Sequence, residues 1–272
     1  MKLRSFAKIN LSLRVFEKRP DGYHNLESVM QSVSLHDIIT IEFIEKGIEV
    51  TCSDPKVPQG KNNIAYKAAE LFLGRGTGDA GRGVKIHIEK KIPMAAGLAG
   101  GSSNAAAVLF GLNQITDYDL RITNDELMNL AAQIGSDVPF CLTGGTCLVK
   151  SRGDVVEKQE PWPKTYFILV CPDLHVSTKW AYEEFDRVHV EAPEGIKNDL
   201  EPVVASRYDI VTETKEKLLR AGCSEAQMSG SGPSVFGALR DKKRAEAILN
   251  RIKDDYPRSF MLGTVDKGIE IC

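Results

Sequence analysis

Long apolar runs are missing from this sequence of 272 residues. A helix that spans a membrane needs about 18 or more consecutive apolar residues, and no such stretch occurs, so we expect no membrane partner. The N-terminus also lacks an apolar segment followed by a cleavage site, which argues against secretion. The cytoplasm is therefore the expected location.

The six cysteines show no metal-binding or disulfide pattern. No C-x-x-C pair occurs, no histidine stands at zinc-ligand spacing, and several of the cysteines lie in apolar runs. We therefore expect reduced thiols in the core and no metal centre built from protein side chains.

An excess of positive charge is absent as well. The chain has 35 Lys and Arg against 37 Asp and Glu, a net charge of −2, which argues against a nucleic-acid partner. The whole chain is 42% hydrophobic and 26% charged, the profile of a globular protein with one large or two moderate domains.

Two common nucleotide-binding patterns are missing or misplaced. No Walker A sequence ending in G-K-[ST] occurs. Residues 76–81, GTGDAG, match the dinucleotide fingerprint G-x-G-x-x-G, but they follow a predicted helix and precede a predicted strand. The fingerprint needs the reverse order, so we interpret this stretch as a surface loop.

A Gly-rich turn followed by an Ala-rich helix occupies residues 93–109, PMAAGLAGGSSNAAAVL. A predicted strand at residues 84–89 leads into it. Small residues let a backbone curl around an anion, and the free N–H groups and positive end of a helix beginning near Ser102 would face that anion. This segment predicts a phosphate-binding loop, with a flexible linker as the alternative.

Polar residues stand out at two further places. Lys8 and Asn10 alternate with Ile9 and Leu11, so on a strand both polar side chains would lie on one face. Asp137 follows a predicted helix and precedes an apolar segment. An ordinary solvated strand face and a simple turn residue are the respective alternatives.

The predicted elements divide the chain into two units. Alternating apolar residues at 39–43 and 48–52 indicate a half-buried antiparallel meander. Helices are predicted near residues 62–73, 178–185 and 208–221. Two prolines bracket Trp162, and the apolar pattern restarts after them. We therefore expect domains at residues 1–160 and 161–272.

Three separated segments together resemble the motifs of the GHMP small-molecule kinase superfamily. They are A-K-I-N-L at residues 7–11 with D-G-Y-H at 21–24, the loop at 93–107, and M-S-G-S-G-P at 228–233. The resemblance runs nearly end to end. It implies a two-domain α/β (α+β) fold, with an N-terminal lobe like domain 2 of ribosomal protein S5 and a ferredoxin-like C-terminal lobe. It also implies an active site in the cleft between them.

The same resemblance implies a kinase that uses ATP with Mg²⁺. Within the superfamily, D-G-Y-H and the I-G-S-D-V-P-F around Asp137 are similar to the branch that phosphorylates a cytidine-diphosphate sugar alcohol in the non-mevalonate isoprenoid pathway. Asp137 then corresponds to the acidic residue near the acceptor hydroxyl, and Lys8 to the lysine beside it. A carboxylate accepts the hydroxyl proton while an ammonium offsets charge on the transferred group. Asn10 resembles the residue that places the acceptor.

The remaining site residues are implied for the two substrates. For the acceptor, Tyr23 and His24 resemble residues that stack on and hydrogen-bond cytosine. Tyr182 resembles a second aromatic residue, so that the cytosine would lie between two rings. Stacking alone tolerates any base, so His24 would have to supply the preference for cytosine. Asn63 and Lys90 stand where the family contacts the donor nucleoside. The donor phosphates would be held by Pro93, Gly97, Leu98, Ala99, Gly100, Gly101, Ser102 and Ser103.

Two departures from the family pattern carry expectations of their own. Ala95, Ala96 and Ala99 replace glycines, which predicts φ values that are open to alanine at these positions. Asn104 stands where other members can carry an acidic residue, which argues against magnesium binding there.

Two other readings of the chain stay open. One is a superfamily enzyme for homoserine or mevalonate, including the diphosphomevalonate decarboxylase type, which would share the loop. The other is a non-catalytic regulator that senses a sugar or a nucleotide, which would not need both Lys8 and Asp137. For the kinase of the cytidine-diphosphate sugar alcohol we expect a monomer or weak homodimer.

Overall fold

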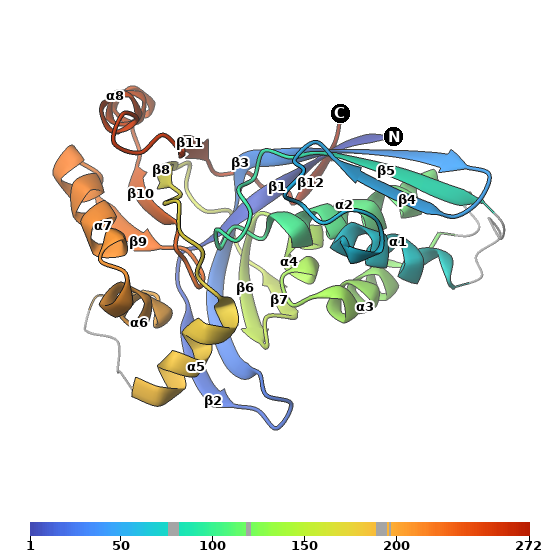
Figure 1. Cartoon of the computed structure of the whole chain (residues 1–272), viewed down its shortest axis with the longest axis horizontal. Coiled ribbons are helices and arrows are strands. Elements are labelled where there is room, and N and C mark those ends of the chain that lie inside the picture. Colours follow the sequence, from blue (N-terminus) through green and yellow to red (C-terminus); the bar gives the residue numbers. More distant parts are fainter. Residues whose placement is uncertain (76–81, 118–120, 189–194, 196) are drawn as a thin grey trace.

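The computed structural model describes residues 1–75, 82–117, 121–188, 195 and 197–272 (Figure 1). The G-x-G-x-x-G stretch at 76–81 lies outside these residues. In the described part of the chain the strands form two sheets, and helices pack against each of them. No helix there is both long enough and apolar enough to span a bilayer.

The first lobe is built on an eight-stranded sheet, and the long strand β3 (His24–Ile44) runs through its middle. β3 pairs with four strands, which are β1 (Lys2–Asn10), β2 (Arg14–Lys18), β5 (Gly83–Glu89) and β6 (Thr146–Ser151). β4 (Ile48–Cys52), β7 (Val155–Lys158) and β12 (Ile269–Ile271) complete the sheet. The predicted antiparallel meander is wrong at β4, because this strand pairs with β5 in parallel.

Among the described residues, the α-helices of the first lobe lie together on one side of its sheet (Figure 1). They are α1 (Ile64–Leu73), α2 (Gly100–Ile115), α3 (Asn124–Ile134) and α4 (Val138–Thr143), and the short 3₁₀ helix η1 (Gly60–Asn62) precedes α1. α2 is buried along most of its length, and Gly111 lets it approach Leu3 and Ile41 of the sheet closely. α2 is thus packed closely against the sheet.

The second lobe contains an antiparallel four-stranded sheet in the order β11-β8-β10-β9. Its strands are β8 (Tyr166–Val170), β9 (Glu225–Met228), β10 (Val235–Leu239) and β11 (Ser259–Gly263), and its helices are α5 (Thr178–Val188), α6 (Leu200–Arg207), α7 (Ile210–Ala221) and α8 (Lys242–Ile252). α5, α6 and α7 lie between β8 and β9, with α7 as the helix directly before β9, and α8 lies between β10 and β11. This βαββαβ succession is ferredoxin-like, as predicted.

The chain crosses between the lobes in both directions. β7 ends at Lys158 and β8 begins at Tyr166, so the predicted boundary near residue 160 falls between the two sheets. β12 then returns to the first sheet, where Ile271 pairs with Leu3 and Ile269 with Ser5. The division into domains of residues 1–160 and 161–272 stays a prediction. β12 falls within the second range but belongs to the sheet of the first lobe.

The cysteines largely occupy the places expected of core thiols. Cys141, Cys147, Cys171 and Cys223 are buried, whereas Cys52 is half-buried and Cys272 is exposed. Burial raises the pKa of the Cys147 and Cys223 thiols to about 11, so both stay protonated at neutral pH and are poor nucleophiles.

Candidate active site

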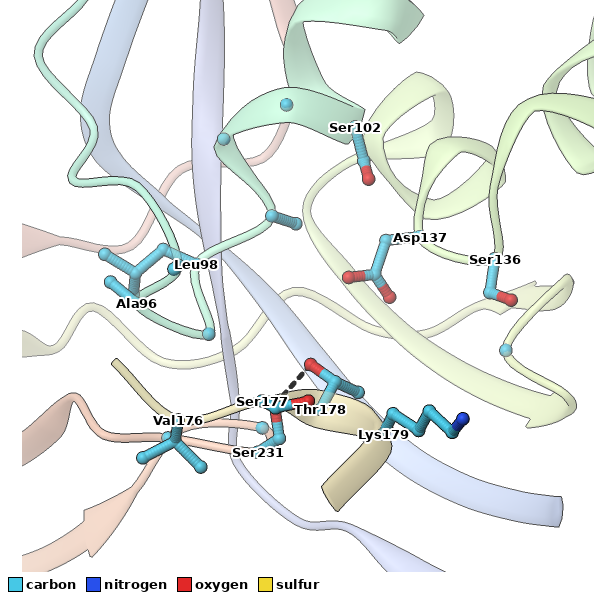
Figure 2. A pocket seen from close by; sticks show the side chains of 18 of the residues that line it. Ala96, Leu98, Ser102, Ser136, Asp137, Val176, Ser177, Thr178, Lys179 and Ser231 are labelled. Carbon is cyan, nitrogen blue, oxygen red and sulfur yellow. Dashed lines mark hydrogen bonds between the residues drawn. The ribbon is translucent and has the colours of Figure 1, made fainter. Parts of the chain in front are cut away.

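A cleft of about 1210 Å³ lies between the lobes and collects nearly all predicted site residues. Figure 2 shows this cleft with Asp137 and Ser102 facing the same space. Ser103 is the exception, because it is fully buried and is not part of the wall. The other predicted residues all line the cleft, namely Lys8, Asn10, Tyr23, His24, Asn63, Lys90, Pro93, Gly97, Leu98, Ala99, Gly100, Gly101, Ser102, Asp137 and Tyr182.

The loop before α2 has a strained backbone. Ala95, Gly97 and Ala99 have φ angles of 50°, 71° and 55°, all in the left-handed region. The prediction that these positions have φ values open to alanine is therefore wrong at Ala95 and Ala99. Ala96 does not have a positive φ. This conformation costs an L-residue about 1–2 kcal/mol, and such strain concentrates at functional sites.

Glycine at either strained position is expected to stabilise the protein. Ala95→Gly and Ala99→Gly each remove about 1–2 kcal/mol of strain and add about 0.5–1 kcal/mol of backbone entropy cost. The net gain in the free energy of unfolding is therefore at most about 1.5 kcal/mol, measurable by urea denaturation. Ala96→Gly is the matched control and should destabilise. A similar loss in all three variants would contradict the assignment of strain.

A second small-residue loop, at residues 229–232, packs against this one. The Ser229 hydroxyl donates to the carbonyl oxygen of Gly97 at 3.2 Å. A Cβ atom on Gly97 would lie only 2.4 Å from the Ser229 carbonyl oxygen. Gly230 and Gly232 line the cleft beside this contact. The two loops therefore meet backbone to backbone and form one continuous wall.

Lys8 and Asp137 meet beside the two loops. The Lys8 ammonium donates to Asn10 Oδ1 at 2.7 Å and to the Gly97 carbonyl at 3.0 Å. It lies 3.8 Å from Asp137 Oδ2. Lys8 and Asn10 are both buried, so the alternative of a solvated strand face is wrong. Asp137 is the N-cap residue of α4, but its side chain makes no capping hydrogen bond. The side chain is 32% exposed and keeps access to the cleft.

Asn10 is held from both lobes. Its Nδ2 donates to the Ser28 hydroxyl at 2.8 Å, and this fixes Oδ1 toward Lys8. Its backbone N–H donates to the Ser229 hydroxyl at 3.3 Å. The ammonium of Lys8 is consequently fixed by groups that belong to three separate segments of the chain.

Lys90 and Asn63 carry structural contacts as well as lining the cleft. Lys90 Nζ donates to Asp37 Oδ2 at 2.7 Å and to the Ile92 carbonyl at 2.5 Å. Asn63 caps α1 by accepting from the Ala65 N–H at 2.9 Å. Both side chains thus hold the segments around the cleft, and contact with the donor nucleoside stays a prediction.

Aromatic residues gather at the far end of the cleft. The rings of His24 and Tyr182 stack with centroids 5.3 Å apart and planes inclined by 25°. Tyr23 is half exposed, and the Arg152 guanidinium lies 5.6 Å from its ring centroid. Burial raises the pKa of Tyr182, and the nearby Asp137 raises it further, so its phenol stays neutral. In this structure Tyr182 thus contacts His24, and the roles toward cytosine stay predictions.

Sequence reasoning missed two residues that organise the cleft. Asp186 accepts from His24 across the lobes, with 2.6 Å between Oδ1 and Nε2. The predicted helix at 178–185 stops one residue short of Asp186; a longer helix would have placed it on the face of Tyr182 by the i, i+4 spacing. Asn198 is fully buried, and its Nδ2 donates to the carbonyls of Met228 and Gly230 at 2.9 and 2.8 Å. No local pattern pointed to Asn198.

The donor groups in the cleft fit a magnesium ion that arrives with phosphates. The described residues hold no cluster of three or more His, Cys, Asp or Glu side chains able to bind a metal. Mg²⁺ typically takes one or two protein oxygens and fills its shell with phosphate oxygens and water. Asp137 and Ser102 offer a carboxylate and a hydroxyl (Figure 2). Asn104 Oδ1 accepts a hydrogen bond from Ser5 at 2.8 Å, and the expectation that it does not bind magnesium stays a prediction.

Comparisons with known proteins agree with this architecture. The family description GHMP kinases N terminal domain matches residues 63–145, and GHMP kinases C terminal matches residues 183–258. A protein of Clostridium botulinum named 4-diphosphocytidyl-2-C-methyl-D-erythritol kinase is 40% identical over 97% of this chain and 100% of its own. Its namesake in Thermoanaerobacter pseudethanolicus is 38% identical over 100% of this chain and 98% of its own.

Solved structures give the same result. The crystal structure of a 4-(cytidine 5'-diphospho)-2C-methyl-D-erythritol kinase superimposes with a TM-score of 0.81 at 30% identity, covering 97% of this chain and 99% of its own. A homoserine kinase from Cytophaga hutchinsonii gives 0.78 at 19% identity over 100% and 97% of the two chains, which shows a shared fold alone. The chain therefore belongs to the GHMP kinase family.

Proposed function

We propose that this protein transfers the γ-phosphoryl group of ATP to the 2-hydroxyl of 4-diphosphocytidyl-2-C-methyl-D-erythritol, in the non-mevalonate isoprenoid pathway. Relatives named for that substrate match the chain over nearly its whole length. The observation that carries the chemistry is the Lys8 and Asp137 pair, 3.8 Å apart beside the loop that precedes α2. The pair lies where the loop and the aromatic end of the cleft meet.

The loop at residues 93–102 holds the phosphates of ATP. Its small residues bring the backbone close to the ligand, and the N-terminus of α2 directs free N–H groups and a partial positive charge at it. Mg²⁺ bound with ATP would neutralise phosphate charge, and Ser102 and Asp137 would be the residues that offer it oxygens from the protein. Lys8 adds a fixed positive charge to the same region.

Asp137 acts on the acceptor hydroxyl. Its carboxylate accepts a hydrogen bond from the 2-hydroxyl and orients that oxygen for in-line attack on the γ-phosphorus. As the new O–P bond forms, the hydroxyl becomes acidic, and its proton passes to the carboxylate. Asn10 helps place the acceptor, and through its bond to Lys8 it keeps the ammonium in position for the transferred group.

The acceptor base occupies the aromatic end of the cleft. Tyr23 and Tyr182 supply ring faces for stacking, and His24 supplies a polar edge. We also propose a cytoplasmic enzyme that acts as a monomer or weak homodimer without a nucleic-acid partner, in keeping with its net charge of −2.

Consumption of ATP with four acceptors tests this function. The cytidyl sugar alcohol should be phosphorylated, whereas homoserine, mevalonate and galactose should give only background hydrolysis. Activity on one of those three alone would assign the chain to another branch of the family. Binding of any acceptor without turnover of ATP would instead favour a sensing regulator.

A further inference from the structure

Asp186 belongs to the second lobe, but its carboxylate reaches into the first. Oδ1 lies 2.6 Å from His24 Nε2, and Oδ2 accepts a hydrogen bond from Lys18 at 2.7 Å. The His24 side chain is only 4% exposed, so water does not compete strongly for this contact. Figure 1 shows α5, which carries Asp186, beside the β2 end of the first lobe. The acceptor end of the cleft is therefore closed by side chains from both lobes.

The carboxylate decides which nitrogen of His24 carries the proton. Burial raises the pKa of Asp186, but the hydrogen bonds from Lys18 and His24 outweigh it, so the pKa lies below its usual value. An ionised carboxylate can only accept hydrogen bonds, so Nε2 of His24 must donate. The neutral imidazole has a single N–H group, and Nδ1 therefore presents a lone pair.

Nδ1 of His24 remains available to a ligand. It makes no hydrogen bond within the described residues. It is also not one of the fully buried polar atoms there that lack a partner, so it keeps some contact with solvent. His24 lines the cleft. Tyr182 stacks on the ring, and Phe185 meets it edge-on at a centroid distance of 6.5 Å. The ring plane is thus fixed by packing, and the tautomer by Asp186.

We propose that Asp186 is a positioning residue that gives the enzyme its preference for a cytosine over a uracil base. The role rests on the proposed function, in which His24 meets the base of the acceptor. The lone pair on Nδ1 accepts a hydrogen bond from the exocyclic amino group of cytosine. Uracil presents a carbonyl oxygen at the same position, and two acceptors facing each other are repulsive.

Removal of Asp186 frees the tautomer of His24. The proton can then move to Nδ1, where it donates to the carbonyl of uracil as readily as the lone pair accepted from cytosine. Asparagine has the same effect, because its amide can turn either its oxygen or its nitrogen toward Nε2. Discrimination falls in both variants, although the pocket and its stacking partners remain.

The experiment compares binding of CDP and UDP by titration calorimetry, with kcat/KM for the cytidyl sugar alcohol and its uridyl analogue as the second readout. The unmodified protein should prefer the cytosine compounds by at least about tenfold. In Asp186→Asn and Asp186→Ala this ratio should approach one, while the KM for ATP stays unchanged. His24→Ala lacks the imidazole that would bond the edge of the base, and it gives the reference value for the ratio of cytosine to uracil preference.

Glu184→Gln is the matched control. It also replaces a carboxylate by an amide on α5, but Glu184 is half-buried, pairs with Arg187 and does not line the cleft. Its ratio should equal that of the unmodified protein. An unchanged ratio in both Asp186 variants, or an equal loss of both nucleotides, would overturn this role. The melting temperatures show whether a variant is unfolded. If Asp186→Ala is unfolded, Asp186→Asn is the variant whose ratio decides the result.

The two proposals fail in different ways. A protein that binds CDP better than UDP but does not phosphorylate the sugar alcohol contradicts the proposed function and leaves the role of Asp186 standing. A protein that phosphorylates cytidyl and uridyl acceptors equally well contradicts the role of Asp186 and leaves a kinase.

Discussion

Replacing Asp137 by asparagine is expected to lower kcat by about 10²- to 10⁴-fold and to weaken ATP binding far less, because the amide oxygen can still serve the metal bound with ATP. The amide has the shape of the carboxylate but cannot take the proton of the acceptor hydroxyl. The Lys8 ammonium keeps its hydrogen bonds to Asn10 and Gly97, so the rest of the site should stay in place. Steady-state kinetics and a separate titration with a non-hydrolysable ATP analogue distinguish the two effects.

Asp173→Asn is the control for this substitution. Asp173 is fully exposed, pairs with Arg258 and does not line the cleft, so its loss should leave kcat unchanged. Near-normal turnover of the Asp137 variant, with ATP bound as usual, would show that another group receives the proton. A drop in ATP affinity of the same size as the drop in kcat would instead indicate that the main role of Asp137 is to hold the metal and phosphates.

Replacing Gly97 by alanine is expected to damage the site and the fold together. The added Cβ would lie 2.4 Å from the Ser229 carbonyl oxygen, a backbone atom that cannot move away by a rotamer change. The φ angle of 71° adds about 1–2 kcal/mol of strain. We expect a loss of at least about 2 kcal/mol in the free energy of unfolding. Displacement of the loop should lower kcat/KM for ATP by about 10²-fold.

Gly47→Ala separates strain from collision. Gly47 has a φ of 84° but nothing within 4 Å of its Cβ position, and it lies outside the cleft. We expect about 1–2 kcal/mol of destabilisation and normal activity. Denaturant titrations and ATP kinetics of both variants make the comparison. Equal stability losses and full activity in both would mean that the two loops tolerate a wider spacing.

Local patterns predicted the elements that are decided by local physics. The capping box of Thr123 and Glu126 at the start of α3 is such a case, because both partners lie within one turn. Asn63 begins α1 for the same reason. The parallel pairing of β4 and the return of β12 depend on strands far apart in sequence. Alternation identifies the buried face of a strand but not the neighbour beside it.

The candidate site divides along the same line. Alternation along β1 placed Lys8 and Asn10 on one face, and the structure shows both buried and bonded to each other. The strained φ angles of Ala95 and Ala99 could not be predicted, because preferences of single residues are overridden by tertiary packing. Asp186 matters only because α5 carries it to His24 on the other lobe.

The return of β12 means that the lobes are not independent in folding. Ile269 belongs to the hydrophobic core of the first lobe, and Gly268 packs directly against the backbone of Cys141 and Gly144. A fragment that ended near residue 160 would leave the edge of β1 unpaired from Leu3 to Ser5 and a gap in that core. Because β12 continues directly from the second lobe, we expect the two lobes to unfold together.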